Sequence, residues 1–498
     1  MSKLLFTMRK LLLSLGLLSL CWVSLPAQEG RLARSADAAL PDSALTIRLD
    51  SLVAARLPQG SEAGIAVYDL TANRPLYARG ADRLSRPAST MKLVTAIAAL
   101  SEPRFDEPFR TEVWCRGRVE ADTLHGDLYV VGGFDPELDD EDLDSLVAAT
   151  ARRASFSVVT GRILGDVSMK DSLYWGSGWL WDDNPASFQP YLSPLMLNKG
   201  VVQVSVAPGL AGDTATVTVL PASTYYTIYN TARTRTSSAG PLRVTRPWME
   251  NSNEILVSGN VTARQTRTIN LYSSQDFFMH TFAERLQTAG IRSLRAVPDS
   301  LYGFSPLQRD SLCTLLAVHE TSAQRVLDEM LKESDNLNAE AVFCRLGLHH
   351  TGHRPVRAKD AVKAVRALME AVGHNPARYR VADGCGLSHY DYLSPELLVS
   401  FLRYAYAHTE VFSKLYKALP VGGIDGTLKH RMGRGTPSYK HVYAKTGSYT
   451  GINCLAGYLQ ARNGHWVAFA IMNQNVLSGR RARALQDALC DELILHCP

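Results

Sequence analysis

Cysteine is scarce in this sequence, and the cysteines that are present do not form close pairs. The 498 residues include eight, of which seven follow the first 27 residues: Cys115, Cys313, Cys344, Cys385, Cys454, Cys490 and Cys497. A disulfide scaffold or a zinc site would need closer spacing, such as C-x-x-C, so we expect no metal site. The odd number leaves at least one thiol unpaired. Cys490 and Cys497 could pair outside the cytoplasm, but isolated buried thiols explain the pattern equally well.

Several other signals are missing as well. The formal charge is only +5 and follows no basic stripe, so we expect no nucleic-acid partner. Neither H-E-x-x-H nor G-x-S-x-G occurs, which argues against a zinc peptidase and against an α/β-hydrolase. After the first 27 residues no segment is long and apolar enough to span a membrane, and hydrophobic residues make up 46% of the chain, as in a globular protein.

The first 27 residues have the pattern of a signal peptide. Lys3, Arg9 and Lys10 precede an apolar run from Leu11 to Leu20, and a cleavage site follows at Ala27. We therefore expect an exported, periplasmic enzyme. Lipid attachment at Cys21 is an alternative, although lipoprotein signals usually have a small residue before the cysteine and this sequence has a leucine there. An uncleaved anchor is another, but the run is shorter than the roughly 20 residues of a membrane helix.

The two ends of the remaining chain carry matching patterns. Near the start, an amphipathic helix over 45–57 precedes a hairpin formed by 65–70 and 75–78. Near the end, a hairpin turns at Asn463-Gly464 and a helix follows over 479–495. These patterns predict an α/β (α+β) sandwich whose halves, 28–103 and 269–498, are far apart in the sequence. Short β-like runs over 104–268 predict one or two inserted β-rich domains.

Three motifs stand in a fixed order along the chain. They are Ser89-Thr90-Met91-Lys92, Ser334-Asp335-Asn336 and Lys445-Thr446-Gly447. Each is weak alone, because short patterns arise by chance. Ser89 and Lys92 form the chain's single S-x-x-K, and K-T-G also occurs only once. The conjunction predicts a serine acyl-transfer enzyme.

Each motif supplies a group that this chemistry needs. Ser89 would be the nucleophile and Lys92 its base, since a lysine three positions on lies on the same helical face. That lysine must be neutral, which burial and a second cation, Lys445, would favour. Ser334 would lie between the two lysines and pass a proton to the leaving amine, and the Asn336 amide would bind the acyl part of the substrate.

The last motif is expected to lie on an edge strand over 442–448. Lys445, Thr446 and Ser448, with Gly447 between them, would hold the terminal carboxylate of a substrate. The backbone N–H groups of Ser89 and Ser448 are the natural donors to an oxyanion, because the charge of a tetrahedral intermediate must be met by fixed dipoles.

Beyond these motifs, the chain resembles the low-molecular-mass class C penicillin-binding proteins, a D-alanyl-D-alanine carboxypeptidase/endopeptidase family of the penicillin-binding protein four type. The resemblance also rests on these segments: Gly126-Asp127-Leu128, Gly132 to Pro136, Trp179 to Asp183, Asp383 to Ser388, Leu419-Pro420-Val421, Asp425-Gly426-Thr427 and Ala456-Gly457-Tyr458. It implies a penicillin-recognising, β-lactamase-like catalytic domain interrupted by two smaller domains. It further implies that peptidoglycan peptides are the substrate, that β-lactams acylate the same serine, and that no cofactor is needed.

The resemblance also implies a specificity residue and exposes two departures. In the family a carboxylate after the tryptophan-rich segment meets the free amino group of the stem's diamino acid, and Asp182 matches best, followed by Asp183. Cys385 and His389 stand where the family usually has serine and arginine. His389 removes a permanent cation, which leaves the preferred third stem residue and its pH dependence open.

Two alternatives remain at this stage. A serine β-lactamase shares the three motifs but deacylates quickly, and the long insertion argues against it; Glu396, which could suggest a deacylating glutamate, is instead expected to begin a helix. The second alternative is a catalytically silent wall-binding protein, although such a protein would have no chemical need for the intact motifs.

Overall fold

The computed structural model describes residues 43–237, 240–295 and 301–498. The predicted signal peptide and Cys21 lie outside these residues. Within the described part of the chain, no helix combines the length and the apolar character that crossing a membrane requires. All seven described cysteines are free, so Cys490 and Cys497 are not bonded to each other.

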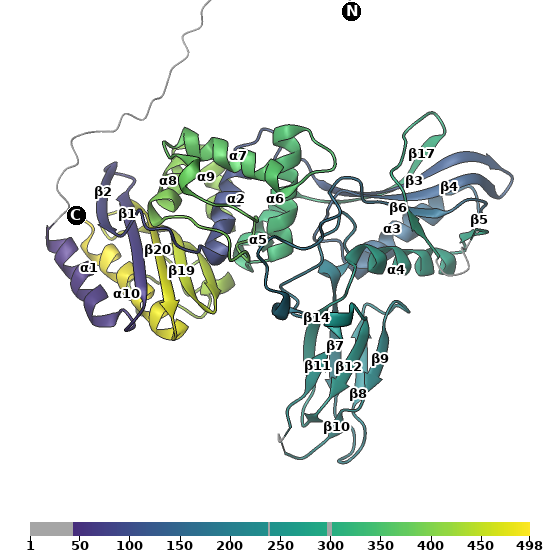
Figure 1. Cartoon of the computed structure of the whole chain (residues 1–498), viewed down its shortest axis with the longest axis horizontal. Coiled ribbons are helices and arrows are strands. Elements are labelled where there is room, and N and C mark those ends of the chain that lie inside the picture. Colours follow the sequence, from purple (N-terminus) through teal and green to yellow (C-terminus); the bar gives the residue numbers. More distant parts are fainter. Residues whose placement is uncertain (1–42, 238–239, 296–300) are drawn as a thin grey trace, which may run out of the picture. The chain divides into compact units, whose positions relative to one another are not determined.

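A five-stranded antiparallel sheet joins the two ends of the chain (Figure 1). Strand β1 pairs with β20 along its whole length, so residues about 400 positions apart are neighbours. Both predicted hairpins are confirmed, and the strand that carries Lys445 lies at one edge of the sheet. In spatial order the strands are β18 (Val442–Tyr449), β19 (Gly451–Gln460), β20 (Trp466–Val476), β1 (Glu62–Asp69) and β2 (Arg74–Arg79).

Helices cover both faces of this sheet. Because successive side chains of a strand point to opposite faces, Ile65 and Val67 pack with α1 (Ser43–Arg56) and α10 (Gly479–His496), whereas Ala66 packs with the opposite helices. The predicted α/β sandwich is therefore confirmed. The helices of the second face are α2 (Met91–Leu100), α5 (Ala323–Lys332), α6 (Asn336–Thr351), α7 (Ala358–Ala371), α8 (Pro395–Ala407) and α9 (Thr409–Ala418).

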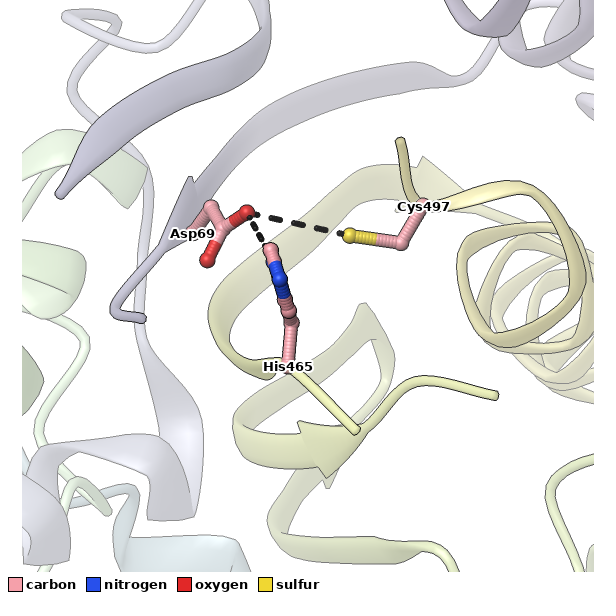
Figure 2. A group of neighbouring side chains, drawn as sticks. All are labelled: Asp69, His465 and Cys497. Carbon is pink, nitrogen blue, oxygen red and sulfur yellow. Dashed lines mark hydrogen bonds and ion pairs between the residues drawn. The ribbon is translucent and has the colours of Figure 1, made fainter. Parts of the chain in front are cut away.

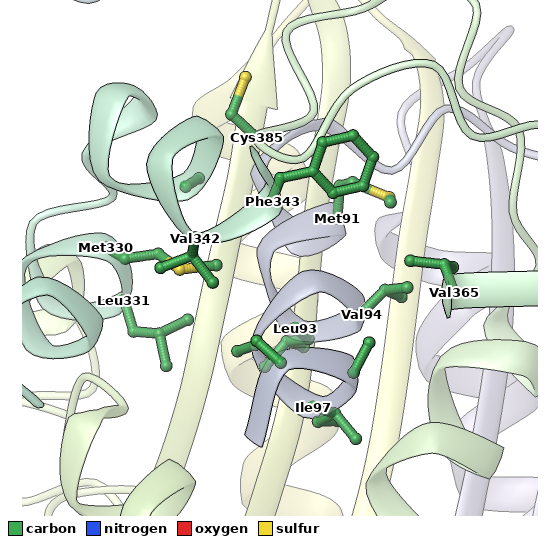
Figure 3. Packing of buried hydrophobic residues seen from close by; sticks show 14 of the residues in the cluster. Met91, Leu93, Val94, Ile97, Met330, Leu331, Val342, Phe343, Val365 and Cys385 are labelled. Carbon is green, nitrogen blue, oxygen red and sulfur yellow. The ribbon is translucent and has the colours of Figure 1, made fainter. Parts of the chain in front are cut away.

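Helix α2 is buried on every side, which decides the environment of the first motif. All ten of its residues are buried, and Figure 3 shows Leu93, Val94 and Ile97 among side chains of neighbouring elements. A helix with apolar residues on every face belongs in a core, and the side chain of its one lysine is 0% exposed. On α8, Glu396 lies in the first turn, as expected from the sequence.

The chain between α2 and α5 folds around a separate apolar cluster. Its main sheet has the spatial order β15-β5-β4-β3-β17, with β6 beside β4 and β16 beside β6, and two helices accompany it. The bounds are β3 (Phe109–Glu120), β4 (Thr123–Gly132), α3 (Asp140–Arg153), β5 (Val158–Val159), β6 (Ile163–Asp166), α4 (Ser274–Thr288), β15 (Arg292–Ser293), β16 (Gly303–Phe304) and β17 (Cys313–Thr321).

Three small sheets complete this region. Their orders are β14-β7-β8, β11-β12-β9 and β10-β13. The strands are β7 (Val201–Ala207), β8 (Thr216–Leu220), β9 (Thr227–Asn230), β10 (Arg233–Thr234), β11 (Arg243–Thr245), β12 (Glu254–Ser258), β13 (Asn260–Val261) and β14 (Gln265–Asn270).

Contacts in the structure favour a C-terminal limit of the insertion later than residue 268, where the sequence places it. Helix α4 packs in the apolar cluster of the insertion, and β17 pairs with β3 from Cys313 to Thr321. These contacts tie residues 271–321 to the inserted sheet, whereas α5 packs with α2 and α6 in the catalytic layer. We therefore propose that the insertion ends near residue 321, so that the catalytic domain comprises residues up to about 103 and from about 322 onward.

Candidate active site

Ser89 lies in a single 3-10 turn, η1 (Ala88–Thr90), that runs directly into α2. One turn further on, the Lys92 Nζ atom is 3.1 Å from the Ser89 Oγ atom. Ser89 is half-buried, while the Lys92 side chain is 0% exposed. The spacing of three residues thus places hydroxyl and amine on one face, with the hydroxyl at the surface and the amine inside.

Two further oxygen atoms surround the Lys92 amine. Asn336 Oδ1 lies 2.6 Å from Nζ and the Cys385 carbonyl oxygen lies 2.8 Å from it. Together with Ser89 these groups use all three donors of an ammonium. Lys92 is therefore held in one position, pointing at the serine, by residues that are 244 and 293 positions away in the sequence.

The second motif forms the connection between α5 and α6. Ser334 adopts a φ of 63°, a left-handed conformation that non-glycine residues seldom adopt and that is often found at functional sites. Asp335 caps α6 by accepting a hydrogen bond from the Asn338 backbone N–H, and it also forms an ion pair with Lys199 of the insertion at 2.8 Å. The cap fixes Asn336 as the first residue of the helix, beside Lys92.

The third motif lies on the edge strand β18. Lys445 is 0% exposed, and its Nζ atom donates to Ser334 Oγ at 2.8 Å and to the Thr446 carbonyl oxygen at 2.8 Å. Thr446 Oγ1 donates to Thr427 Oγ1 at 2.8 Å. Ser448 is exposed next to this group. The structure therefore brings all three motifs together, and two serine–lysine pairs meet around one site.

Burial changes the protonation of both lysines. Removal from water disfavours a charged amine, so the pKa of Lys92 falls below its ordinary value. Burial also lowers the pKa of Lys445 well below the usual range, and the nearby charge of Lys92 lowers it further. Burial therefore favours the neutral form of both amines, and the mutual charge effect appears in the pKa of Lys445 rather than in that of Lys92.

Gly447 lets the edge strand approach Ser89 closely. A Cβ atom at this position would lie 2.8 Å from the Pro87 carbonyl oxygen and 2.9 Å from the amide nitrogens of Ser89 and Thr90. No side chain fits there without moving the backbone of either the strand or the serine turn.

We predict that Gly447→Ala slows acylation of Ser89 on the order of 100-fold, because displacing a catalytic group by about 1 Å has an effect of this size. The measurement is the rate of penicillin adduct formation by stopped-flow or quenched mass spectrometry. Gly433→Ala is the matched control, since a Cβ atom there meets no atom within 4 Å. Equal rates in the two variants would contradict the close approach of β18.

A buried acidic network lies behind Lys92. Glu340, one helical turn after Asn336, accepts the backbone N–H groups of Gly384 and Cys385 at 2.8 and 2.9 Å. These bonds fix the peptide whose carbonyl oxygen holds Lys92. Burial and the neighbouring Asp383 carboxylate raise the pKa of Glu340 to about 7. Asp383 in turn accepts the Trp179 indole N–H at 2.8 Å, which attaches the tryptophan-rich loop to the site.

The tryptophan-rich loop carries the predicted specificity residue. Asp182 is exposed in a short 3-10 turn, η2 (Trp181–Asp183), and Asp183 is half-buried. Asp183, not Asp182, is close enough to His389 for each to affect the pKa of the other. The ring of His389 stacks on Tyr449 at 4.7 Å. Burial and then the charge of Arg86 lower the pKa of His389, which favours the neutral ring over a cation at this position.

Several residues of the site were not predicted from the sequence. Glu340 and the Cys385 carbonyl position Lys92, and the Phe188 carbonyl oxygen accepts the Asn336 Nδ2 amide at 2.7 Å. Both ends of the Asn336 side chain are thus engaged in this structure, whereas it was expected to bind the substrate. The placement of Glu340 four residues after Asn336 on one helix is a signal that could have identified it.

Residues 45–493 match the D-Ala-D-Ala carboxypeptidase 3 (S13) family of peptidases. The D-alanyl-D-alanine carboxypeptidase of Actinomadura sp. is 31% identical over 469 residues, which cover 89% of this chain and 83% of that protein. The D-alanyl-D-alanine carboxypeptidase DacB of Haemophilus influenzae is 27% identical over 418 residues, covering 83% of this chain and 85% of the relative.

Solved structures agree with this assignment at the level of the fold. The crystal structure of penicillin binding protein 4 (dacB) from Haemophilus influenzae superposes with a TM-score of 0.77 at 24% identity and covers 91% of this chain and 100% of its own. The same protein complexed with a β-lactam gives a TM-score of 0.72 at 23% identity, with the same coverage. The penicillin-recognising fold expected from the motifs is confirmed. With nine-tenths of its length matched by the family, the chain belongs to the D-Ala-D-Ala carboxypeptidase 3 (S13) family of serine peptidases.

Proposed function

We propose that this protein is a serine D-alanyl-D-alanine carboxypeptidase and endopeptidase that acts on peptidoglycan stem peptides and their cross-links through an acyl-enzyme at Ser89. The observation that carries the proposal is the meeting of the Ser89–Lys92 and Ser334–Lys445 pairs, at 3.1 and 2.8 Å, around one half-buried hydroxyl. Membership of the peptidase family and the β-lactam complex of a protein with the same fold support it.

In the proposed reaction, neutral Lys92 takes the proton of the Ser89 hydroxyl while the oxygen attacks the carbonyl carbon of the penultimate D-alanine. The backbone N–H groups of Ser89 and Ser448 would meet the charge on the carbonyl oxygen. When the C–N bond breaks, the leaving amine takes a proton delivered from the lysine pair through Ser334. Water then attacks the ester while Lys92 takes its proton, and as the C–O bond to Ser89 breaks Lys92 passes this proton to the serine oxygen, which restores the enzyme and releases the acid product.

The strand residues would hold the leaving part of the substrate. Lys445, Thr446 and Ser448 line the same edge, and Gly447 keeps this edge next to the serine turn. Binding of a substrate's terminal carboxylate at this edge would account for carboxypeptidase activity. Binding of a D-alanine-linked cross-link in the same place would account for endopeptidase activity. We further propose that the enzyme works in the periplasm after cleavage of residues 1–27, and that it requires neither metal nor organic cofactor for this reaction.

The decisive test is the intact mass of the protein during incubation with penicillin over several hours. We expect one covalent adduct per chain that persists, because a peptidase of this kind deacylates slowly from the drug. An adduct that disappears while the drug is consumed would instead identify a serine β-lactamase. If no adduct forms at all, the acyl-enzyme is excluded and the silent wall-binding alternative is favoured.

We propose that Asp182 binds the free amino group of the stem's diamino acid, with Asp183 beside it. Its exposure at the tip of η2 leaves the carboxylate accessible. Asp182→Asn should lower kcat/KM about 10-fold for a stem peptide that carries this amino group, since a partly exposed charge-assisted hydrogen bond contributes roughly 1 to 2 kcal/mol. The check is a comparison with the N-acetylated peptide, which both proteins should cleave equally. A loss of the same size for both peptides would assign Asp182 a structural role.

A further inference from the structure

Three metal-ligating side chains meet at the end of the central sheet, although the sequence offers no close pair of ligands. They are Asp69 at the end of β1, His465 directly before β20 and Cys497 directly after α10. Figure 2 shows the three side chains pointing toward one another. One ligand atom from each lies within 4.8 Å of the other two.

The distances from Asp69 to the other two ligands are close to those of a tetrahedral zinc centre. Bond lengths of about 2.0 to 2.3 Å place neighbouring ligand atoms roughly 3.3 to 3.8 Å apart. Asp69 Oδ2 lies 2.8 Å from His465 Nδ1 and 4.0 Å from Cys497 Sγ. The ligand atoms of His465 and Cys497 lie within 4.8 Å of each other, so side-chain shifts on the order of 1 Å would complete the geometry.

The surroundings already orient the ligands. The other carboxylate oxygen of Asp69 accepts the backbone N–H groups of Thr71 and Ala72 at 3.0 and 2.9 Å, which fixes Oδ2 toward the cluster. The side-chain amide of Asn463 donates to the Cys497 carbonyl oxygen at 3.1 Å and holds the segment after α10 against the hairpin. Asp69 is fully buried, but His465 and Cys497 are half-buried, so an ion and a water ligand could enter from solvent.

The donor set selects the kind of ion. One carboxylate oxygen, one imidazole nitrogen and one sulfur suit Zn²⁺, whereas Ca²⁺ and Mg²⁺ prefer oxygen ligands throughout. A carboxylate, a thiolate and a neutral imidazole carry two negative charges, which balance a divalent cation in a site that is largely removed from water. The same three residue types could also form a nucleophilic cysteine site, but there the imidazole would contact the thiol, whereas here both His465 and Cys497 contact the Asp69 carboxylate, which lies between them.

We propose that Asp69, His465 and Cys497 form a zinc site that ties the end of α10 to strands β1 and β20. Zn²⁺ would replace two hydrogens that now lie among the three side chains. The Cys497 thiol releases one proton to solvent, and the imidazole changes tautomer so that the Nδ1 lone pair faces the ion. Water would complete the fourth position, as it does in zinc sites with three protein ligands.

Cobalt titration tests this directly, because a thiolate bound to Co²⁺ gives a charge-transfer band in the near ultraviolet. The purified chain is freed of metal with a chelator, which is then removed, and Co²⁺ is added under reducing conditions. We expect the band to saturate at about one equivalent and to disappear when Zn²⁺ displaces the cobalt. Absence of the band with several equivalents of Co²⁺ at pH 7.5 would overturn the proposal.

Variants identify the ligands. Cys497→Ser should abolish the band, and His465→Gln should weaken Co²⁺ binding by at least about 100-fold, since even residues behind the ligands cost 10 to 100-fold. Cys313→Ser is the matched control, because Cys313 is also partly exposed but lies on β17, and it should keep the band. A band that survives in Cys497→Ser would place the metal elsewhere and refute the site.

A labelling experiment does not depend on any variant folding. In the wild-type chain, Zn²⁺ should slow alkylation of Cys497 by iodoacetamide at least about 10-fold and leave that of Cys313 unchanged, as followed by peptide mapping. If Zn²⁺ slowed alkylation of both cysteines equally, or slowed neither, the three residues would form only a hydrogen-bonded cluster. Penicillin acylation of Ser89 in the same sample reports on the catalytic site separately, so the two proposals can fail independently.

Discussion

Ser89→Ala should form no penicillin adduct and should release D-alanine from a stem pentapeptide on the order of 10⁴ to 10⁶ times more slowly than the wild type. Losses of this size follow removal of the nucleophile in serine hydrolases, because the remaining groups act as one unit with it. The geometry points the same way, since the Lys92 amine lies 3.1 Å from the Ser89 hydroxyl and its two other partners are an amide oxygen and a backbone carbonyl oxygen.

The measurement pairs intact mass with a coupled D-alanine assay. Ser145→Ala is the matched control, because this serine is exposed on α3 of the insertion and should behave as the wild type. The thermal unfolding midpoint of both variants should stay near that of the wild type, since a half-buried hydroxyl contributes little to stability. A Ser89→Ala protein that still binds penicillin covalently would mean that another residue is the nucleophile.

The parts of the site that sequence predicted are those fixed by local geometry. The spacing of Ser89 and Lys92 on one helix determines their contact, and Asn463-Gly464 determines where β19 turns into β20. The burial of α2 also follows from its composition, because a helix without a polar face can only lie in a core. These features need no knowledge of how distant segments meet.

The parts that sequence did not predict depend on contacts across hundreds of residues. Lys92 donates hydrogen bonds to Asn336 and to the Cys385 carbonyl oxygen, which belong to distant segments of the chain. Asn336 comes close to Lys92 because α6 packs on α2. Residue type cannot predict the contact made by the Phe188 carbonyl oxygen, because every residue has a backbone carbonyl group. The limit that we propose for the insertion also depends on a distant contact, because the alternation of β17 does not reveal which sheet the strand joins.

The same limitation explains why the cysteine spacing gave no hint of the proposed zinc site. Asp69 is 396 positions from His465 and 428 from Cys497, so no spacing rule could connect them. The closure of the sheet by β1 and β20 brings them together. The same pairing of the two chain ends thus builds the catalytic sandwich and the candidate metal site.

Lys92→Met should reduce the rate of Ser89 acylation by about 10² to 10⁴-fold, the usual contribution of a positioned general base. Methionine has a similar length and suits a buried position, but it cannot accept a proton. Loss of the amine leaves Asn336 Oδ1 and the Cys385 carbonyl oxygen without this donor, so we also expect a destabilisation of about 1 to 3 kcal/mol. Lys440→Met, which changes an exposed lysine, is the control for both effects.

The pH dependence separates the chemical role of Lys92 from a structural one. In the wild type the acylation rate should rise with pH as Lys92 loses its proton and fall about tenfold per pH unit below its pKa, because only the neutral amine accepts the serine proton. Burial lowers this pKa, so the rise should occur at lower pH than an exposed lysine would give. The wild-type rate should level off above this pKa, whereas in Lys92→Met the residual rate should follow hydroxide with no such plateau. A variant that keeps the wild-type profile at a reduced rate would show that Lys92 only positions the site and that another group is the base.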